Sequence, residues 1–181
     1  MIPVGYMAKR VMVGPDWINA PRVKDVYSVS SHVSNDFADY IKFWKHNGYW
    51  FFDSPQIIRQ VARQNGVDLT GTALFFYEVH ERQWNGDQWV AFQQEDSFAT
   101  NVIPPAAKAL EGFDVVTFRA GTSAECSPLS CNSLASEVET NSHCLLTSFE
   151  SACALLEQGR FAETEPGPYR ILAVYSTHWP P

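Results

Sequence analysis

The chain has 181 residues, a formal net charge of −7, an apolar share of 45% and an aromatic share of 14%. This composition supports a well-formed core and excludes the low hydrophobicity and high charge of a disordered chain. The acidic balance and the scattered Lys and Arg residues argue against a nucleic-acid binder, which needs clustered basic side chains. No apolar run approaches the roughly 20 residues that cross a bilayer. Residues 1–13 lack the layout of a secretory signal, so we expect a soluble, cytoplasmic protein that binds neither nucleic acid nor membrane.

The first half of the chain predicts strands, two helices and a hairpin. Strands are expected over 4–13, 24–33 and 49–53, the last almost wholly apolar and therefore central in a sheet. Apolar residues at helical spacing predict a helix over 34–48. A second helix is expected over 54–66, with Ser54 as its cap, Pro55 as its first residue and Gly66 at its end. Residues 72–84 and 88–92 flank an Asn-Gly pair and predict an antiparallel hairpin.

The second half begins after Pro104 and Pro105, which block a central strand. We interpret residues 101–112 as a connection between two halves, 1–103 and 106–181, of a single domain. Strands are predicted over 113–121, 142–148 and 167–177, and a short helix over 148–159. The mixed order predicts an α+β fold with a mostly antiparallel sheet and three to four helices packed on one side of it.

Two short similarities link the halves. The stretch "FFDSPQIIRQVA" shares its Ser-Pro pair and helical pattern with "AECSPLSCNSLA", and "SHVSNDF" parallels "SHCLLTSF". These matches are too short to establish a duplication.

The stretch "AGTSAECSPLSCNSLASEV", residues 120–138, concentrates thiol, hydroxyl and amide side chains after a predicted strand. If Ser127 caps a helix, Cys126 lies just outside the helix N-terminus, where open amides favour anions and can lower a thiol pKa. The pattern predicts a module that binds a small ligand, an anion among the candidates, or a protein partner. The predicted ligand-binding residues are Arg119, Ser127, Ser130, Cys131 and Asn132.

The same loop allows an alternative function, that of a cysteine-dependent enzyme. Cys126 would be the nucleophile, His143 the base and Asn132 a stabilising group. A structural role as cap and core filler competes with this hypothesis. Whether the protein is an enzyme therefore stays open at this point.

A zinc site is a weaker candidate in the same region, because Cys126, Cys131, His143 and Cys144 are all ligand types that zinc accepts. Adjacent residues on a strand point to opposite faces, which separates His143 from Cys144. We therefore expect no metal and no cofactor.

Trp84 and Trp89 flank the hairpin turn. A two-residue Asn85-Gly86 turn pairs Trp84 with Asp87, whereas a loop centred on Gly86-Asp87 pairs Trp84 with Trp89. Exposed at the tip, the two indoles would bind a partner or a second copy of the chain. The competing interpretation is that both rings fold down onto the edge of the core.

Overall fold

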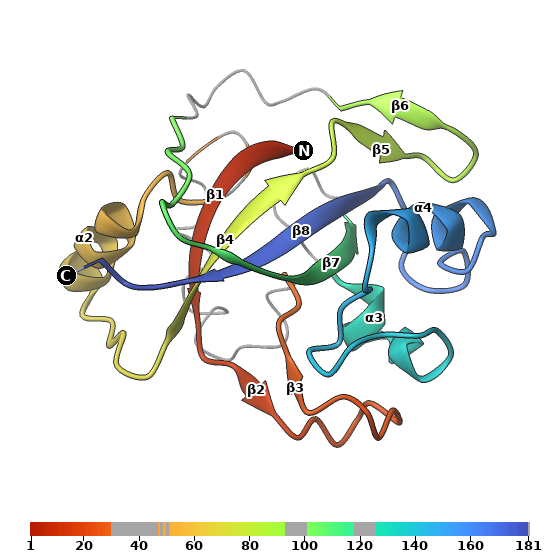
Figure 1. Cartoon of the computed structure of the whole chain (residues 1–181), viewed down its shortest axis with the longest axis horizontal. Helices are drawn as coiled ribbons and strands as arrows, with labels where there is room; N and C mark the ends of the chain where they lie inside the picture. The colour runs from red at the N-terminus through yellow and green to blue at the C-terminus, as the bar shows by residue number, and fades with distance from the viewer. Residues whose placement is uncertain (30–46, 48, 50, 93–100, 118–125, 181) are drawn as a thin grey trace.

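The computed structural model describes residues 1–29, 47, 49, 51–92, 101–117 and 126–180. Within this part, six strands form one sheet in which every pair of strands is antiparallel. Among the described residues, three helices accompany the sheet, so the predicted α+β fold with a mostly antiparallel sheet is confirmed (Figure 1).

The sheet has β8 at its centre. The strand order is β1-β4-β8-β5-β6, and β7 pairs with the other edge of β8; β2 and β3 form a separate small ribbon. The strands are β1 (Ile2–Lys9), β2 (Met12–Val13), β3 (Asp25–Val26), β4 (Ala73–Val79), β5 (Arg82–Trp84), β6 (Trp89–Ala91), β7 (Ala109–Thr117) and β8 (Tyr169–Thr177).

Local capping signals fix the two longer helices, α2 (Pro55–Asn65) and α4 (Phe149–Glu157). The Ser54 hydroxyl accepts a hydrogen bond from the Ile57 amide, and Gly66 ends α2 with a φ of 66°. Ser148 caps α4 in the same way. The predicted start and end of α2 are confirmed because each depends only on residues within one turn of the helix end. The third helix is α3 (Pro128–Cys131), and a 3-10 turn follows at Leu134–Ser136. The helix predicted over 34–48 lies outside the described residues, apart from Asn47.

Two predicted strands are not strands. Within 49–53, Phe52 makes an isolated bridge to Tyr6, and within 142–148, Leu146 makes an isolated bridge to Phe113. The predicted strand over 24–33 reduces to β3, with residues from 30 onward outside the described part. The apolar composition of these two segments correctly predicted that they are buried, but it did not predict that they lack extended strand pairing. They lack it because side chains bind the backbone amides of both segments.

Asn47 and Asn141 are those side chains, and they make the same set of hydrogen bonds. Each amide nitrogen donates to a carbonyl of an edge strand, and each amide oxygen accepts from the backbone amides two and four residues further along. The partners are Val4, Tyr49 and Phe51 for Asn47, and Glu111, His143 and Leu145 for Asn141. A side chain that binds alternate amides holds the chain in a bend instead of a strand.

The bends belong to a longer arrangement that occurs twice. In each half, a strand bulges at a glycine, Gly5 in β1 and Gly112 in β7, where the register of its ladder shifts. A capped helix follows each bend, α2 after Ser54 and α4 after Ser148. The structural counterpart of the Ser54-Pro55 pair is therefore Ser148-Phe149. The sequence similarity to Ser127-Pro128 pairs residues that are not structurally equivalent.

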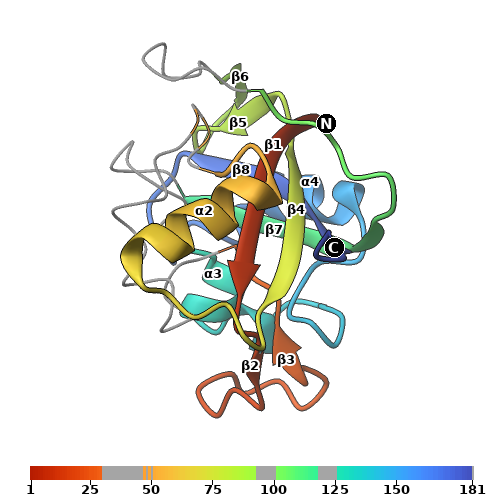
Figure 2. The same cartoon turned by 90° about the vertical axis from the view of Figure 1, so that its left-hand side faces the viewer.

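The sheet carries apolar clusters on both faces. Leu74 and Phe76 of β4 belong to the cluster under α2, whereas Phe75 and Tyr77 belong to a second cluster, as the alternation of a strand requires. α4 packs on a third cluster that includes Ile171 of β8. Figure 2 shows α2 lying across the sheet in front of β1 and β4.

The hairpin has the longer of its two predicted loops. Trp84 pairs with Trp89, and the Asn85 side chain accepts hydrogen bonds from the amides of Asp87 and Gln88. The alternative register, which pairs Trp84 with Asp87, is wrong. The Asn85 side chain stabilises the four-residue loop by satisfying two amides that the turn leaves without strand partners.

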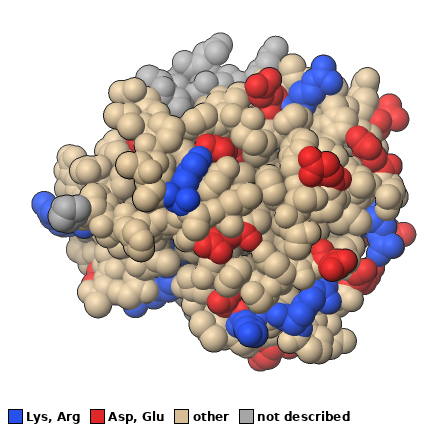
Figure 3. Space-filling model, in the orientation of Figure 1, with Lys and Arg blue, Asp and Glu red and all other residues tan. Residues whose placement is uncertain are grey.

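Basic and acidic side chains are interspersed on the face shown in Figure 3. Lysines and arginines lie there singly or in small groups. No helix in the described part of the chain is long and apolar enough to cross a membrane.

Candidate functional site

The segment singled out by its thiols and hydroxyls lies beside β7. Cys126 makes an isolated bridge to Thr117, and α3 follows directly. The Trp17 indole donates a hydrogen bond to the Ser130 carbonyl, which closes the outer side of α3. Arg119 lies outside the described residues.

The start of α3 is buried. Ser127 and Ser130 are both fully inaccessible to solvent, and the Leu129 side chain belongs to the core. Ser127 makes no side-chain cap; its hydroxyl donates to the Asp114 carboxylate at 2.5 Å. The open amide end that the sequence suggested is thus closed by packing, which leaves the anion-binding prediction without an accessible surface at this end.

The Cys126 thiol contacts two of the residues expected near it. It donates to the Asn132 side-chain oxygen, 3.3 Å away, and lies within hydrogen-bond reach of Cys131. The hydrogen bond with Cys131 and burial both raise the pKa of Cys126 well above its ordinary value. A raised pKa favours the thiol over the nucleophilic thiolate.

His143 makes its contacts elsewhere. Its ring stacks on Tyr27 with centroids 4.1 Å apart; Nδ1 lies 2.5 Å from Asp25, and Nε2 lies 3.8 Å from Glu111. Among the described residues, no hydrogen bond joins His143 to Cys126. The structure therefore brings Asn132 and Cys131 to Cys126 but does not bring the expected base. In that same part of the chain, no three His, Cys, Asp or Glu side chains form a group that could hold a metal ion.

Sequence analysis missed a buried polar network next to this segment. The Asp114 carboxylate accepts hydrogen bonds from the amides of Val29 and Val115 as well as from Ser127. The Lys9 ammonium donates to the Ser28 carbonyl. Burial raises the pKa of Asp114 to about 6 and lowers the pKa of Lys9 to about 7. The sequence signal for this network was the presence of a charged residue, Lys9 or Asp114, within each of two otherwise mostly apolar predicted strands.

The two indoles of the hairpin pack against protein. Trp84 and Trp89 stack edge to face at 5.4 Å and contact the cluster under α4. The Trp89 indole also donates to Glu157 at 2.8 Å. Both rings are half-buried, so the interpretation in which they cover the core accounts for most of their surface; binding of a partner by this hairpin stays a prediction.

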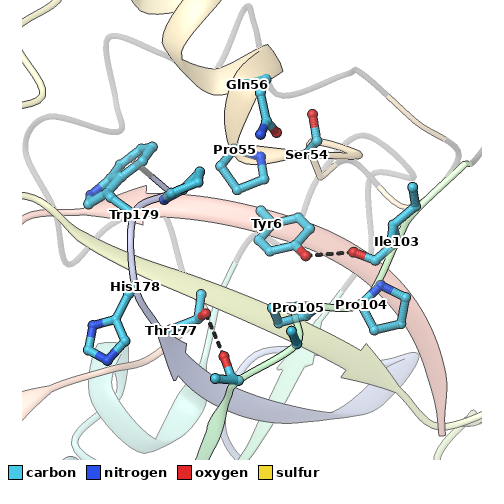
Figure 4. Close-up of a pocket in the computed structure, with 13 residues that line it drawn as sticks. Tyr6, Ser54, Pro55, Gln56, Ile103, Pro104, Pro105, Thr177, His178 and Trp179 are labelled. Carbon is cyan, nitrogen blue, oxygen red and sulfur yellow. Dashed lines mark hydrogen bonds between the residues drawn. The ribbon is translucent and has the colours of Figure 1, made fainter.

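A pocket of about 460 Å³ opens at the other end of the sheet (Figure 4). Its walls come from four places in the sequence: Tyr6 of β1, the start of α2, the segment before β7 and the segment after β8. The lining residues are Tyr6, Ser54, Pro55, Gln56, Ile103, Pro104, Pro105, Ala106, Ala107, Thr177, His178, Trp179 and Pro180.

Hydrogen bonds hold these walls together. The Tyr6 hydroxyl donates to the Ile103 carbonyl at 2.6 Å, and the Thr177 hydroxyl donates to the Ala107 carbonyl at 2.8 Å. The Trp179 indole donates to the Thr72 carbonyl at 3.1 Å. Burial also raises the pKa of Tyr6 to about 12. The pocket is thus built into the fold.

The sequence carried only weak signs of this pocket. Pro104 and Pro105 were interpreted as a connection. Trp179 is held in place: besides its hydrogen bond, the Arg59 guanidinium lies 5.4 Å from the ring centroid. A tryptophan at the end of a chain and a proline pair with an exposed Ile103 were the signals that could have pointed here.

No protein-family model, curated protein or solved structure has significant similarity to this chain. Its function must therefore be inferred from the site itself.

Proposed function

We propose that this protein is a binding protein and that the pocket between β1, α2 and the end of β8 holds a small, mostly apolar ligand. The observation that carries the proposal is the pocket itself. Its volume lies within the range of ligand pockets, roughly 300–1,000 Å³, and its lining is dominated by proline, alanine and aromatic side chains. Such a lining favours an apolar ligand because burying apolar surface is the main source of affinity.

Polar groups at the edge of the pocket would orient the ligand. Gln56 and His178 both line the pocket and are exposed, and neither side chain has a hydrogen-bond partner within the described residues. Ile103 is 73% exposed at the same opening. A ligand that covers Ile103 while accepting or donating one hydrogen bond at Gln56 or His178 suits this arrangement.

Binding at the segment 126–132 has less support, because the start of α3 is buried. The cysteine-enzyme alternative also has less support. Its nucleophile has a raised pKa, and its base contacts Asp25 instead. We therefore place the proposed ligand in the pocket and not at Cys126.

The proposal is tested with a fluorescent apolar probe, anilinonaphthalene sulfonate. We expect the folded protein to bind the probe at one saturable site with increased probe emission. Ala106→Phe puts a ring into the pocket and should abolish that binding. The matched control is Ala91→Phe, which adds the same ring at an exposed position of β6 and should leave binding unchanged. Equal binding by both variants would contradict the proposal.

A further inference from the structure

The two repeated halves give the pocket a counterpart elsewhere in the molecule. Tyr6 pairs with Phe76 in the β1–β4 ladder, and Phe113 pairs with Ala173 in the β7–β8 ladder. Tyr6 and Phe113 each directly follow the bulge glycine of their strand, so these two residues are equivalent. Phe52 bridges to Tyr6 as Leu146 bridges to Phe113, which agrees with this assignment.

The equivalence extends to two further positions of the pocket wall. Pro55 is the first residue of α2, and Phe149 is the first residue of α4. Thr177 lies four positions beyond Ala173, and His80 lies four positions beyond Phe76. Pro55 and Thr177 of the pocket therefore correspond to Phe149 and His80.

Around Phe113, aromatic rings occupy this place. The rings of His80 and Phe149 meet with centroids 4.9 Å apart, and the Phe149 ring lies 6.2 Å from that of Phe113. Both contacts are edge to face, one of the arrangements that aromatic pairs prefer. These side chains thus close the site around Phe113, whereas the equivalent site around Tyr6 stays open.

Around Tyr6, the equivalent side chains are too small to fill the space. Pro55 and Thr177 carry no aromatic ring, while Tyr6 keeps the ring that corresponds to Phe113 and packs on Phe76 with centroids 5.0 Å apart. Figure 4 shows Tyr6, Pro55 and Thr177 together around the pocket, with the Trp179 ring on the same side as Pro55. The fold therefore supplies one or two aromatic walls here, and the two positions that carry rings around Phe113 carry none.

We propose, resting on the function proposed above, that the ligand is a small molecule with an aromatic ring, and that this ring takes the place beside Tyr6 that the Phe149 ring takes beside Phe113. The ring packs against Tyr6 as the Phe149 ring packs against Phe113. Trp179 provides a second aromatic surface. An aliphatic ligand of the same size gains the burial of apolar area but not the aromatic contacts.

The test compares naphthol with decahydronaphthol, which match in size and hydroxyl group but differ in aromaticity. Binding is followed by titration against isotope-labelled wild-type protein in two-dimensional NMR. We expect naphthol to bind about fivefold to tenfold more tightly, the ratio that one or two aromatic pair contacts provide. Intermolecular nuclear Overhauser effects should connect its ring to Tyr6 and Trp179.

Pro55→Phe supplies the missing ring from the protein. Because Phe149 occupies the same helix position, the variant keeps the Ser54 cap, and it should lose naphthol binding. Gln60→Phe on the exposed part of α2 is the matched control and should bind like the wild type.

The outcomes separate the two proposals. If neither compound binds, the proposed function is overturned. If decahydronaphthol binds as well as naphthol or better, the function stands and the aromatic ligand is overturned. Tighter naphthol binding without contacts to Tyr6 also overturns the aromatic assignment. So does naphthol binding that is unchanged in a folded Pro55→Phe variant. If that variant does not fold, the contacts measured in the wild-type protein still decide between the outcomes.

Discussion

Gly5 and Gly112 each lie so close to a backbone carbonyl that a side chain would not fit. A Cβ atom on Gly5 would lie 2.6 Å from the Phe52 carbonyl oxygen, and one on Gly112 would lie 2.8 Å from that of Leu146. Their φ values are +135° and +151°, a backbone region that residues other than glycine rarely adopt. The bulges in β1 and β7 therefore require glycine for both conformation and space.

Replacing either glycine with alanine should destabilise the protein by about 2–4 kcal/mol, because strain in the backbone adds to a clash with backbone atoms that cannot move away. The measurement is urea unfolding followed by tryptophan fluorescence. Gly71→Ala is the control: its φ is +75°, but nothing lies within 4 Å of the added atom, so its cost should be about 1 kcal/mol. Equal losses at all three positions would show that close approach plays no part.

The Asn141 side chain should matter more than its size suggests. Asn141→Ala leaves the Glu111 carbonyl and the amides of His143 and Leu145 without the partners that they have now. These groups are only partly buried, so each costs less than the roughly 1–3 kcal/mol of a fully buried unsatisfied group, and we expect a total loss of about 2–4 kcal/mol in the free energy of unfolding.

Asn85→Ala provides a comparison of the same chemistry at an exposed turn. It removes two hydrogen bonds to backbone amides that water can replace, and it should cost less than about 1 kcal/mol. Thermal or urea unfolding of both variants checks the prediction. A larger loss at Asn85 than at Asn141 would contradict it.

Lys9 should make the stability of the protein depend on pH above neutrality. Burial lowers its pKa in the folded state to about 7, whereas an unfolded lysine keeps a pKa of about 10.4. Between these values the unfolded state holds a proton that the folded state lacks, so the free energy of unfolding rises with pH. Lys9→Met should remove this rise.

The control for that pH profile is Lys24→Met at an exposed position, which should keep the wild-type slope between about pH 7 and pH 10. The nearby charges that act on Lys9 are those of Asp114 and Cys131, and both raise its pKa against the larger effect of burial. The measurement is urea unfolding at several pH values. A Lys9→Met profile parallel to that of the wild type would disprove the assignment.

The Cys126 thiol should react slowly in the folded protein. It is 6% exposed and its pKa is raised, so little thiolate meets a reagent at pH 7. Treatment with iodoacetamide followed by peptide mass mapping should find Cys126 unmodified in the native protein and modified in urea. Fast native modification of Cys126 would restore the cysteine-enzyme hypothesis.

Cys144 serves as the internal reference in the same experiment. It is fully buried, and burial raises its pKa to about 12. Both thiols should become reactive together when the chain unfolds.

The cytoplasmic location expected from the sequence is a separate prediction, which fractionation of cells that express the protein would check.

The amino-acid sequence by itself determined the elements whose signals are local. Ser54 and Gly66 define α2, Ser148 defines α4, and runs of apolar residues define β4 and β8, because caps and apolar patterns act within a few residues. The mixed order of the predicted elements was also sufficient for the fold class.

Tertiary structure alone decided what lies around the candidate sites. Whether the start of α3 is open depends on Trp17 and Asp114, which are distant in sequence from Ser127. The pocket is likewise assembled from β1, the start of α2, residues 103–107 and residues 177–180. No local pattern encodes such a meeting, because it arises from the register of the β1–β4, β4–β8 and β7–β8 ladders, which join residues far apart in the sequence.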